Sequence, residues 1–319
     1  MKRTLALVLA LVLAASALFA FAGCNGKKTY TVGICQLVKH VALDAATKGF
    51  RDALVKELGE GNVTFLEQNA QGDSTACTTI VNDFVSKKVD LIMANATAAL
   101  QAAYSATSTI PILGTSITEY SVALNLKDFN GTVGGNVSGT SDLAPLDEQA
   151  AMLVELFPDA KKVGLLYCSA EPNSDYQVKV ITEELSKKGI TCTKFAFTDS
   201  NDVAAVTQRA AADSDVLYIP TDNTAASNTA LINANAGTVP IICGEEGICA
   251  GCGVATLSIS YYDLGYKTGE MAAKILKKEA KVSEMKIEYA PAVKKYNAAK
   301  CTELGITIPE GYTAITPAQ

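Results

Sequence analysis

Acidic and amide side chains stand in pairs at two points of the chain where they could do polar chemistry. Asp222 and Asn223 follow one apolar, strand-like run, and Glu245 and Glu246 follow another. Short polar residues that end a strand and begin a helix can cap that helix or contact a bound molecule. Glu245 and Glu246 could also pair as an acid and a base. We favour a cap with a ligand contact, or a solvated charge, for these two glutamates.

The sequence gives no positive indication of catalysis. His40 is its only histidine, which excludes most histidine-based catalytic machinery. Mechanisms that use carboxylate pairs or cysteine alone stay open. No GxGxxG motif and no lysine-containing phosphate loop opens a helix. We therefore expect a protein that is not an enzyme and that carries no cofactor.

The cysteines could serve redox chemistry, metal binding or packing. Nine are present, and Cys249 and Cys252 form a CxxC motif that could be a redox pair or half of a zinc site. A zinc site needs two more ligands, and Cys243 is the nearest other thiol in the sequence. Several cysteines, such as Cys35, lie in strand-like apolar runs where a thiol behaves as a small apolar side chain. We expect free thiols and no metal site, although the sequence does not decide whether Cys249 and Cys252 pair.

The first 23 residues have the pattern of a secretory signal. Met1–Arg3 is basic, Leu5–Phe21 is apolar without a charge, and small residues precede Cys24. This pattern resembles a bacterial lipoprotein signal, in which Cys24 is lipidated and becomes the mature N-terminus. A plain signal peptide or an anchor helix is the alternative. We expect residues 24–29 to form a tether and the mature protein to be extracytoplasmic, held at the cell membrane by its lipid.

The composition is that of a folded protein with an acidic balance. Hydrophobic residues make up 49% of the 319 residues and charged residues 19%, which argues against disorder. This length is enough for two domains. The formal net charge is −6 and no large basic cluster is present, so we expect no nucleic-acid partner. Beyond the N-terminal signal, no apolar stretch approaches membrane-spanning length.

Short apolar runs alternate with longer segments of helical periodicity, which predicts an α/β fold. We expect strands at residues 30–36, 63–68, 89–94, 110–114, 162–167, 190–197, 216–219, 239–243 and 254–259. Helices are expected between them, among others at residues 41–58, 143–157 and 262–278. Several strands are apolar without alternation, as parallel strands buried on both faces should be.

Residues 130–145 separate two halves that look alike. This stretch contains four glycines and has no helical periodicity. Glycine tolerates unusual backbone angles and close backbone approach, so the stretch could be a crossing strand or a hinge between two domains. An ordinary surface loop after the fourth strand is the alternative.

Five motifs in one chain make a resemblance specific. They resemble the periplasmic-binding-protein-like family of ABC transporter substrate-binding lipoproteins, and within it the tryptophan/tyrosine-type (TrpX-like) members. The motifs lie at residues 68–73 (QNAQGD), 135–145 (GNVSGTSDLAP), 171–174 (EPNS), 218–223 (YIPTDN) and 258–266 (SISYYDLGY). The resemblance extends from Tyr30 to about Lys278.

The resemblance implies two doubly wound parallel-sheet lobes that close on a ligand by hinge motion. Three crossings would join them near residues 117–137, 257–261 and 286–291. Lobe 1 would consist of residues 30–137 and 258–287, and lobe 2 of residues 138–257 and 288–319.

The same resemblance implies a solute-binding lipoprotein of an ABC importer. It would capture a small molecule, an amino acid and above all an aromatic one, and deliver it to a permease and its ATPase. We expect a monomer. The alternative is an extracytoplasmic sensor or adhesin with the same fold and no transport role.

Ligands of open α/β sheets bind beyond the carboxyl ends of the strands, and here those ends are polar in both halves. A zwitterionic ligand needs hydroxyl or N–H donors for its carboxylate and an acid for its ammonium group. We expect the cleft to be lined by Gln36, Thr97, Ser116, Ser138, Asp142, Asn173, Ser174, Asp222, Asn223 and Glu245. Tyr104, Tyr120 and Tyr261 are the candidates for stacking on an aromatic ligand.

Overall fold

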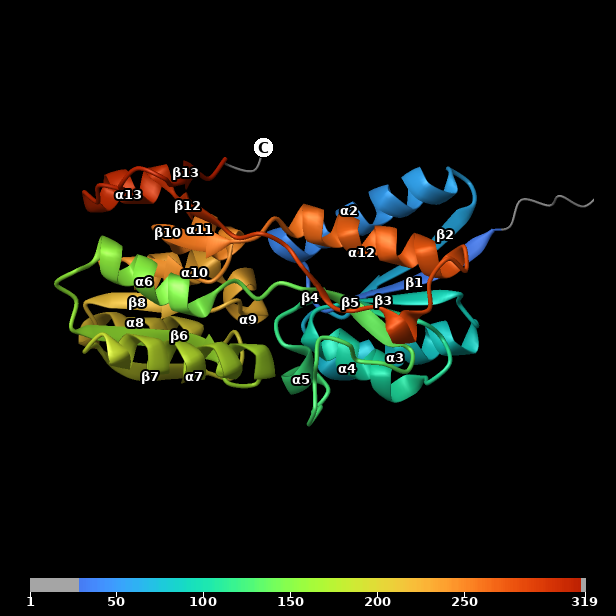
Figure 1. The fold of residues 1–319 in the computed structure, drawn as a ribbon. Helices are drawn as coiled ribbons and strands as arrows, with labels where there is room; N and C mark the ends of the chain where they lie inside the picture. Colours follow the sequence, from blue (N-terminus) through green and yellow to red (C-terminus); the bar gives the residue numbers. More distant parts are fainter. Residues whose placement is uncertain (1–28, 317–319) are drawn as a thin grey trace, which may run out of the picture.

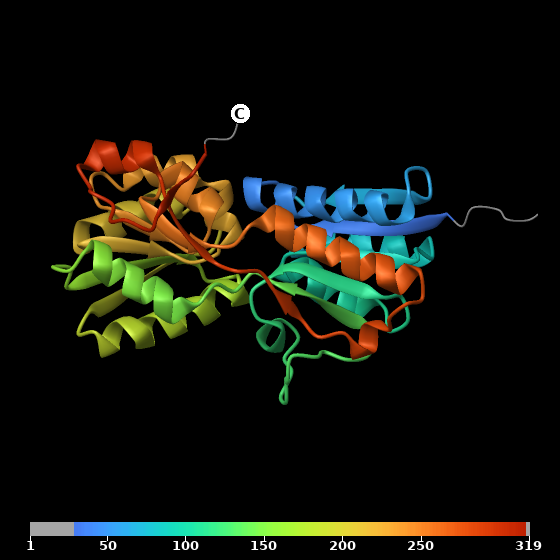
Figure 2. The same cartoon turned by 45° about the horizontal axis from the view of Figure 1, so that its top comes forward.

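The computed structural model describes residues 29–316, and the predicted signal peptide and Cys24 lie outside these residues. Two lobes lie side by side, each built on one β-sheet with helices on both of its faces (Figure 1). Figure 2 shows three chain segments, coloured green, orange and red, that pass between the lobes. The expected α/β fold with two lobes and three crossings is therefore confirmed.

The first lobe holds a six-stranded parallel sheet in the order β11-β5-β4-β3-β1-β2. Its strands are β1 (Tyr30–Gln36), β2 (Val63–Asn69), β3 (Leu91–Asn95), β4 (Ile112–Ile117), β5 (Val137–Ser141) and β11 (Glu288–Tyr289). Its helices are α2 (Val41–Leu58), α3 (Ser74–Ser86), α4 (Thr97–Ala106), α5 (Tyr120–Ala123), α12 (Tyr261–Leu276) and the 3₁₀ turn η1 (Val282–Glu284). In Figure 1, α2 and α12 cover one face of this sheet, and α3 and α4 cover the other.

The second lobe holds a seven-stranded sheet in the order β13-β12-β10-β9-β8-β6-β7, in which only the β10–β12 pair is antiparallel. Its strands are β6 (Lys162–Cys168), β7 (Thr191–Phe197), β8 (Val216–Ile219), β9 (Ile241–Cys243), β10 (Ala255–Ser258), β12 (Val293–Tyr296) and β13 (Thr313–Ala314). Its helices are α6 (Leu146–Leu156), α7 (Pro172–Lys187), α8 (Val203–Asp213), α9 (Asn223–Ser227), α10 (Thr229–Asn235), α11 (Glu246–Cys252) and α13 (Ala298–Leu304).

The central strands are apolar on both sides because helices cover both faces of each sheet. In β1, Val32 and Ile34 pack with Phe50 of α2, while Cys35 packs on the opposite face with Phe84 of α3. A strand buried on both faces has no polar alternation, which explains the continuous apolar runs in the sequence.

The three crossings follow strand ends. The chain leaves the first sheet after β5, through residues 142–145, and returns after β10 through residues 259–260. It crosses a third time between β11 and β12, at residues 290–292. The expected crossing at residues 117–137 is wrong, because this segment stays in the first lobe and leads into β5, which pairs with β4. The expected lobe boundary between residues 137 and 138 consequently cuts β5 instead of following it.

Glycines bring α2 and α12 into close contact. A Cβ atom at Gly265 would overlap the carbonyl oxygen of Ala46, and one at Gly49 would overlap the carbonyl oxygen of Tyr262. Only glycine lets the two backbones approach this closely. The ends of α2 and α12 that face the second lobe hold residues of the site described below.

All eight cysteines in the described part of the chain are free, including Cys249 and Cys252. Within residues 29–316, no cluster of three or more His, Cys, Asp or Glu side chains could hold a metal ion. No helix among the same residues is long and apolar enough to cross a membrane.

Candidate ligand-binding site between the lobes

A narrow cavity of about 10 Å³ lies between the lobes, at the carboxyl ends of strands from both sheets. It is lined by His40, Leu43, Ser116, Thr118, Asp142, Asn173, Thr221, Asp222, Asn223, Ala226, Glu245 and Tyr261. Six of the ten predicted site residues are among them: Ser116, Asp142, Asn173, Asp222, Asn223 and Glu245. Loops from both lobes therefore converge on one shared volume.

Asp142 is the first residue after β5 and lies at the first crossing. Its side chain is buried, and the hydroxyl of Tyr261, at the second crossing, donates to Oδ2 over 2.9 Å. Oδ1 is also buried but has no hydrogen-bond partner among the described residues. Burial raises the pKa of the Asp142 carboxyl to about 6, against the opposing effect of the Tyr261 hydroxyl and of the nearby Thr118 hydroxyl. An unpaired carboxylate oxygen in a closed cavity is costly, so Asp142 can take a cationic hydrogen-bond donor.

Ser116 presents a second unpartnered group. The register between β4 and β5 shifts between Gly114 and Ile117, and within this irregularity Ser116 has a φ of 56°. A non-glycine residue in the left-handed region is strained, and such strain persists where the surrounding structure holds it. The buried Ser116 Oγ has no partner among the described residues. It can donate to or accept from a molecule in the cavity.

Asp222 lines the cavity, but both of its carboxylate oxygens are already bound. Oδ1 accepts from the backbone N–H of Ala225 (2.8 Å), which makes Asp222 the N-cap of α9, and Oδ2 accepts from Cys168 N–H (2.7 Å). Burial, followed by repulsion from Glu171, raises the pKa of Asp222 to about 7. Asp222 thus fixes the loop after β8 to the end of β6.

Glu245, like Asp222, both lines the cavity and caps a helix. It is the N-cap of α11, and its carboxylate accepts from the backbone N–H groups of Gly247 and Ile248. Burial raises the pKa of Glu245 to about 7. Its neighbour Glu246 points elsewhere and pairs with Lys295. The two glutamates are therefore not arranged as an acid and a base.

Asn173 and Asn223 are oriented by their neighbours. The side-chain amide of Asn173 donates to Thr221 O (3.1 Å) and to Glu171 (3.2 Å). Glu171 also accepts from both the backbone N–H and the side-chain amide of Asn223. The remaining amide oxygen of Asn223 lies 3.3 Å from Nε2 of His40. The sequence-based site did not include His40 or Glu171, although both lie in polar loops after strands β1 and β6.

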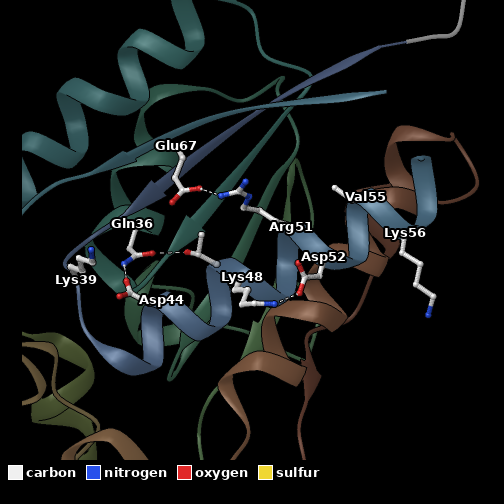
Figure 3. Close-up of a pocket in the computed structure, with 10 residues that line it drawn as sticks. Gln36, Lys39, Asp44, Lys48, Arg51, Asp52, Val55, Lys56 and Glu67 are labelled. Carbon is white, nitrogen blue, oxygen red and sulfur yellow. Dashed lines mark hydrogen bonds and ion pairs between the residues drawn. The ribbon is translucent and has the colours of Figure 1, made fainter. Parts of the chain in front are cut away.

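Four predicted site residues do not line the cavity, and Gln36 is the first of them. Figure 3 shows it in an open, charged groove beside α2, where Arg51 pairs with Glu67 over 3.0 Å. Gln36 donates to Asp44 and accepts from Thr47, each over 2.6 Å. These bonds use the amide to join the end of β1 to α2.

The other three predicted residues that do not line the cavity are Thr97, Ser138 and Ser174. Ser138 lies at the amino end of β5, because that strand begins at Val137, and its hydroxyl donates to Met285 O over 3.1 Å. Thr97 is buried in the first turn of α4. Ser174 is fully buried in α7, where it contacts Asn173 and Asp222 behind the cavity.

Of the three tyrosines considered for stacking, Tyr261 lines the cavity. Tyr120 is buried in the first lobe, where its hydroxyl donates to Gly114 O and Thr140 O. Tyr104 is 44% exposed on α4. A mainly apolar groove of about 350 Å³ adjoins the cavity at Tyr261 and Glu245, and small residues of α2 and α11 line it, among them Ala42, Ala45 and Ala250.

Comparison with known proteins identifies the family. Residues 31–316 match the family model described as ABC transporter substrate binding protein. The chain is 39% identical over 256 residues to a tyrosine-binding protein of Clostridioides difficile, covering 79% of this chain and 74% of that protein.

Two solved structures are also similar. One is the ABC domain of Streptococcus pneumonia in complex with L-Trp (31% identity, TM-score 0.85, covering 90% of this chain and 100% of that one). The other is the ligand-free, open structure of a Clostridium difficile substrate-binding protein with adhesive properties, CD0873 (37% identity, TM-score 0.69, covering 91% and 100%). More distant solute-binding proteins share the two-lobed type I fold. This chain belongs to the family of ABC transporter substrate-binding proteins.

Proposed function

We propose that this protein captures an aromatic amino acid between its lobes and delivers it to an ABC permease. The observation that carries the proposal is the pair of buried, unpartnered oxygens at the cavity, Asp142 Oδ1 and Ser116 Oγ. Buried polar atoms without partners are rare in proteins, and these two line the cavity, where a ligand or a water molecule can complete them.

The chemistry of the cavity suits a zwitterion. Asp142 Oδ1 is free to accept from an ammonium group, and this charge-assisted bond would offset the cost of burying the carboxylate. The hydroxyls of Ser116 and Thr118 lie at the end of β4, the strand that pairs with β5, and can donate to a ligand carboxylate. Asp222 and Glu245 then act mainly by holding the loops in place, because backbone N–H groups occupy their oxygens.

An aromatic side chain has a place beside this polar end. Tyr261 borders both the cavity and the mainly apolar 350 Å³ groove, so a ring that points from the cavity into the groove would lie against Tyr261. The similarity to a tyrosine-binding protein and to a chain solved with L-Trp supports the same ligand class.

The arrangement of the lobes supports closure as the mode of capture. The structure superposes better on the L-Trp complex than on the open, ligand-free chain, although the open chain is more similar in sequence. Two proteins of one fold superpose less well when their lobes are rotated differently about the crossings, as in an open and a closed form. We therefore propose that the described structure is the closed form.

The proposal includes a lipid anchor at Cys24 and a monomeric protein outside the cytoplasm. A basic start, an apolar run and small residues before Cys24 support lipidation. Expression in a bacterium followed by mass spectrometry of the membrane fraction should give a mature N-terminus at Cys24 with an added lipid mass. A Cys24→Ser variant should appear without that mass, and an unmodified cysteine in the wild-type protein would exclude the anchor.

Thermal-shift measurements with each of the twenty amino acids, followed by calorimetric titration of those that bind, test the ligand. We expect L-tyrosine or L-tryptophan to raise the melting temperature most, because a ligand that binds only the folded state stabilises it. A sensor or adhesin remains the second candidate, since one similar chain has adhesive properties. Uptake of the radiolabelled amino acid that is lost on deletion of the gene supports transport, whereas unchanged uptake favours the second candidate.

A further inference from the structure

His40 connects the two lobes across the cavity. It is the N-cap residue of α2 in the first lobe, but its side chain makes no capping hydrogen bond. The imidazole instead lines the cavity, with Nε2 3.3 Å from Oδ1 of Asn223 at the start of α9 in the second lobe. This bond exists only while the two loops face each other, so opening of the lobes must break it.

The direction of the bond follows from the contacts of Asn223. Its side-chain nitrogen donates to Glu171 Oε2 over 2.7 Å, and its backbone N–H donates to the same oxygen over 3.0 Å. The amide oxygen is therefore the atom that faces His40, and an oxygen can only accept. His40 Nε2 must carry the hydrogen and donate. Glu171 thus holds an acceptor ready for the imidazole.

Burial controls the charge of His40. It lowers the pKa of the imidazole, and this effect exceeds the opposing influence of the bond to Asn223 and of the charges on Glu171 and Asp44. The imidazole is therefore neutral in the closed form at neutral pH. In an open form it would regain water and its ordinary pKa of about 6.5. Because the closed form binds the proton less tightly than the open form, closure becomes less favourable as the pH falls below about 6.5.

We propose that His40 is a positioning residue for closure, which retains the ligand by donating from Nε2 to Asn223 across the cavity. The inference rests on the proposed function, because it concerns the release of a ligand from the closed cleft. It adds a residue whose protonation couples ligand release to acid pH.

Stopped-flow dissociation of L-tyrosine and L-tryptophan from the full chain tests it, at pH 7.5 and 5.5. At pH 7.5, His40→Ala should release the ligand roughly 3- to 10-fold faster, as expected for one lost hydrogen bond, with little change in the association rate. His40→Gln keeps a donor that does not titrate, so it should restore slow release at pH 7.5. It should also show a smaller acceleration at pH 5.5 than the wild type. Lys39→Ala, an exposed neighbour, is the control and should behave as the wild type.

Asp142, Asp222 and Glu245 titrate in the same range, but they are present in every variant, so the difference between variants isolates His40. Equal dissociation rates for the wild type and His40→Ala at pH 7.5 would overturn the inference. An undiminished pH effect in His40→Gln would also overturn the coupling to acid. Absence of any binding by the wild type would instead refute the proposed ligand, and the role of His40 in retaining it would fall too.

Discussion

Among the single residues that line the cavity, Asp142 has a buried carboxylate oxygen without a partner in the described part of the chain. Its Oδ1 is buried without a partner, while Oδ2 accepts from Tyr261. Asp142→Asn should weaken L-tyrosine binding by roughly 10- to 100-fold, the loss of one charge-assisted hydrogen bond. The ligand-free protein should be as stable as the wild type or more stable, because a costly buried carboxylate is removed. Calorimetric titration and thermal unfolding measure the two effects.

Ser138→Ala is a matched control for this change. Ser138 was predicted at the site, but its hydroxyl binds Met285 O in the first lobe. The variant should unfold at a lower temperature and bind the ligand with unchanged affinity. If Ser138→Ala weakened binding as much as Asp142→Asn, the assignment of the cavity would be wrong.

The pH dependence of stability has a defined sign for the buried carboxyls. The folded-state pKa is raised to about 6 for Asp142 and to about 7 for Glu245, above their ordinary values near 4. The folded protein then binds more protons than the unfolded chain between roughly pH 4 and pH 7. This contribution to stability is present below that window and is lost as the pH rises through it. The melting temperature of ligand-free Asp142→Asn, relative to the wild type, should therefore increase from pH 4.5 to pH 7.5. A constant difference would mean that the Asp142 pKa is not raised.

Asp222 illustrates what a sequence cannot decide about a single residue. A short acid at the end of a strand and the start of a helix can be a cap or a ligand contact, and the structure shows the cap beside the cavity. Because Ala225 and Cys168 would lose their acceptor, we expect Asp222→Ala to lower the unfolding free energy by about 1–3 kcal/mol. Chemical denaturation without ligand measures this. Unchanged stability with weakened binding would restore the ligand-contact role.

At the scale of elements, α2 and α12 act as one unit. Their backbones meet at Gly49 and Gly265, and their ends carry His40 and Tyr261 to the cavity. A methyl group at Gly265 must push the helices apart, so Gly265→Ala should cost about 1–3 kcal/mol or more and should also weaken ligand binding. Gly189→Ala is the control, because no atom lies near its added methyl and only its φ of 77° opposes the change. Equal unfolding free energies for the two variants would contradict the close contact of the helices.

The elements that sequence reasoning predicted well are those buried on both faces. β1 and β8 were predicted with the bounds that the structure gives them, because an apolar run without alternation has few alternatives. β5 was missed as a strand of the first sheet. Its sequence, Val-Ser-Gly-Thr-Ser, is polar, and it is buried because β4, β11 and α12 cover it. The short β11, β12 and β13 have no periodicity to read and depend on tertiary pairing.

The prediction of the site was limited in the same way, because some of its residues are placed by tertiary contacts. Position at the end of a strand was enough to predict four residues that line the cavity, namely Ser116, Asp142, Asp222 and Glu245. It could not find His40, whose contact with Asn223 depends on a loop of the other lobe. It also included Thr97 and Gln36, which are buried but do not line the cavity. Contacts between residues far apart in the sequence decided these cases.

At the scale of the whole molecule, the cavity borders the first two crossings between the lobes. Asp142 stands on the first crossing and Tyr261 directly follows the second, so their hydrogen bond connects the site to the hinge. A ligand that binds Asp142 therefore acts at the point about which the lobes would rotate. Ligand binding and lobe closure should be one event.

Small-angle X-ray scattering of the mature chain, titrated with L-tyrosine or L-tryptophan, tests this claim most directly. The radius of gyration should fall as the site fills and should saturate at one ligand per chain. Asp142→Asn should need roughly 10- to 100-fold more ligand for the same change. Saturating binding with no change in the radius of gyration, or a change that Asp142→Asn does not shift, would contradict capture between closing lobes.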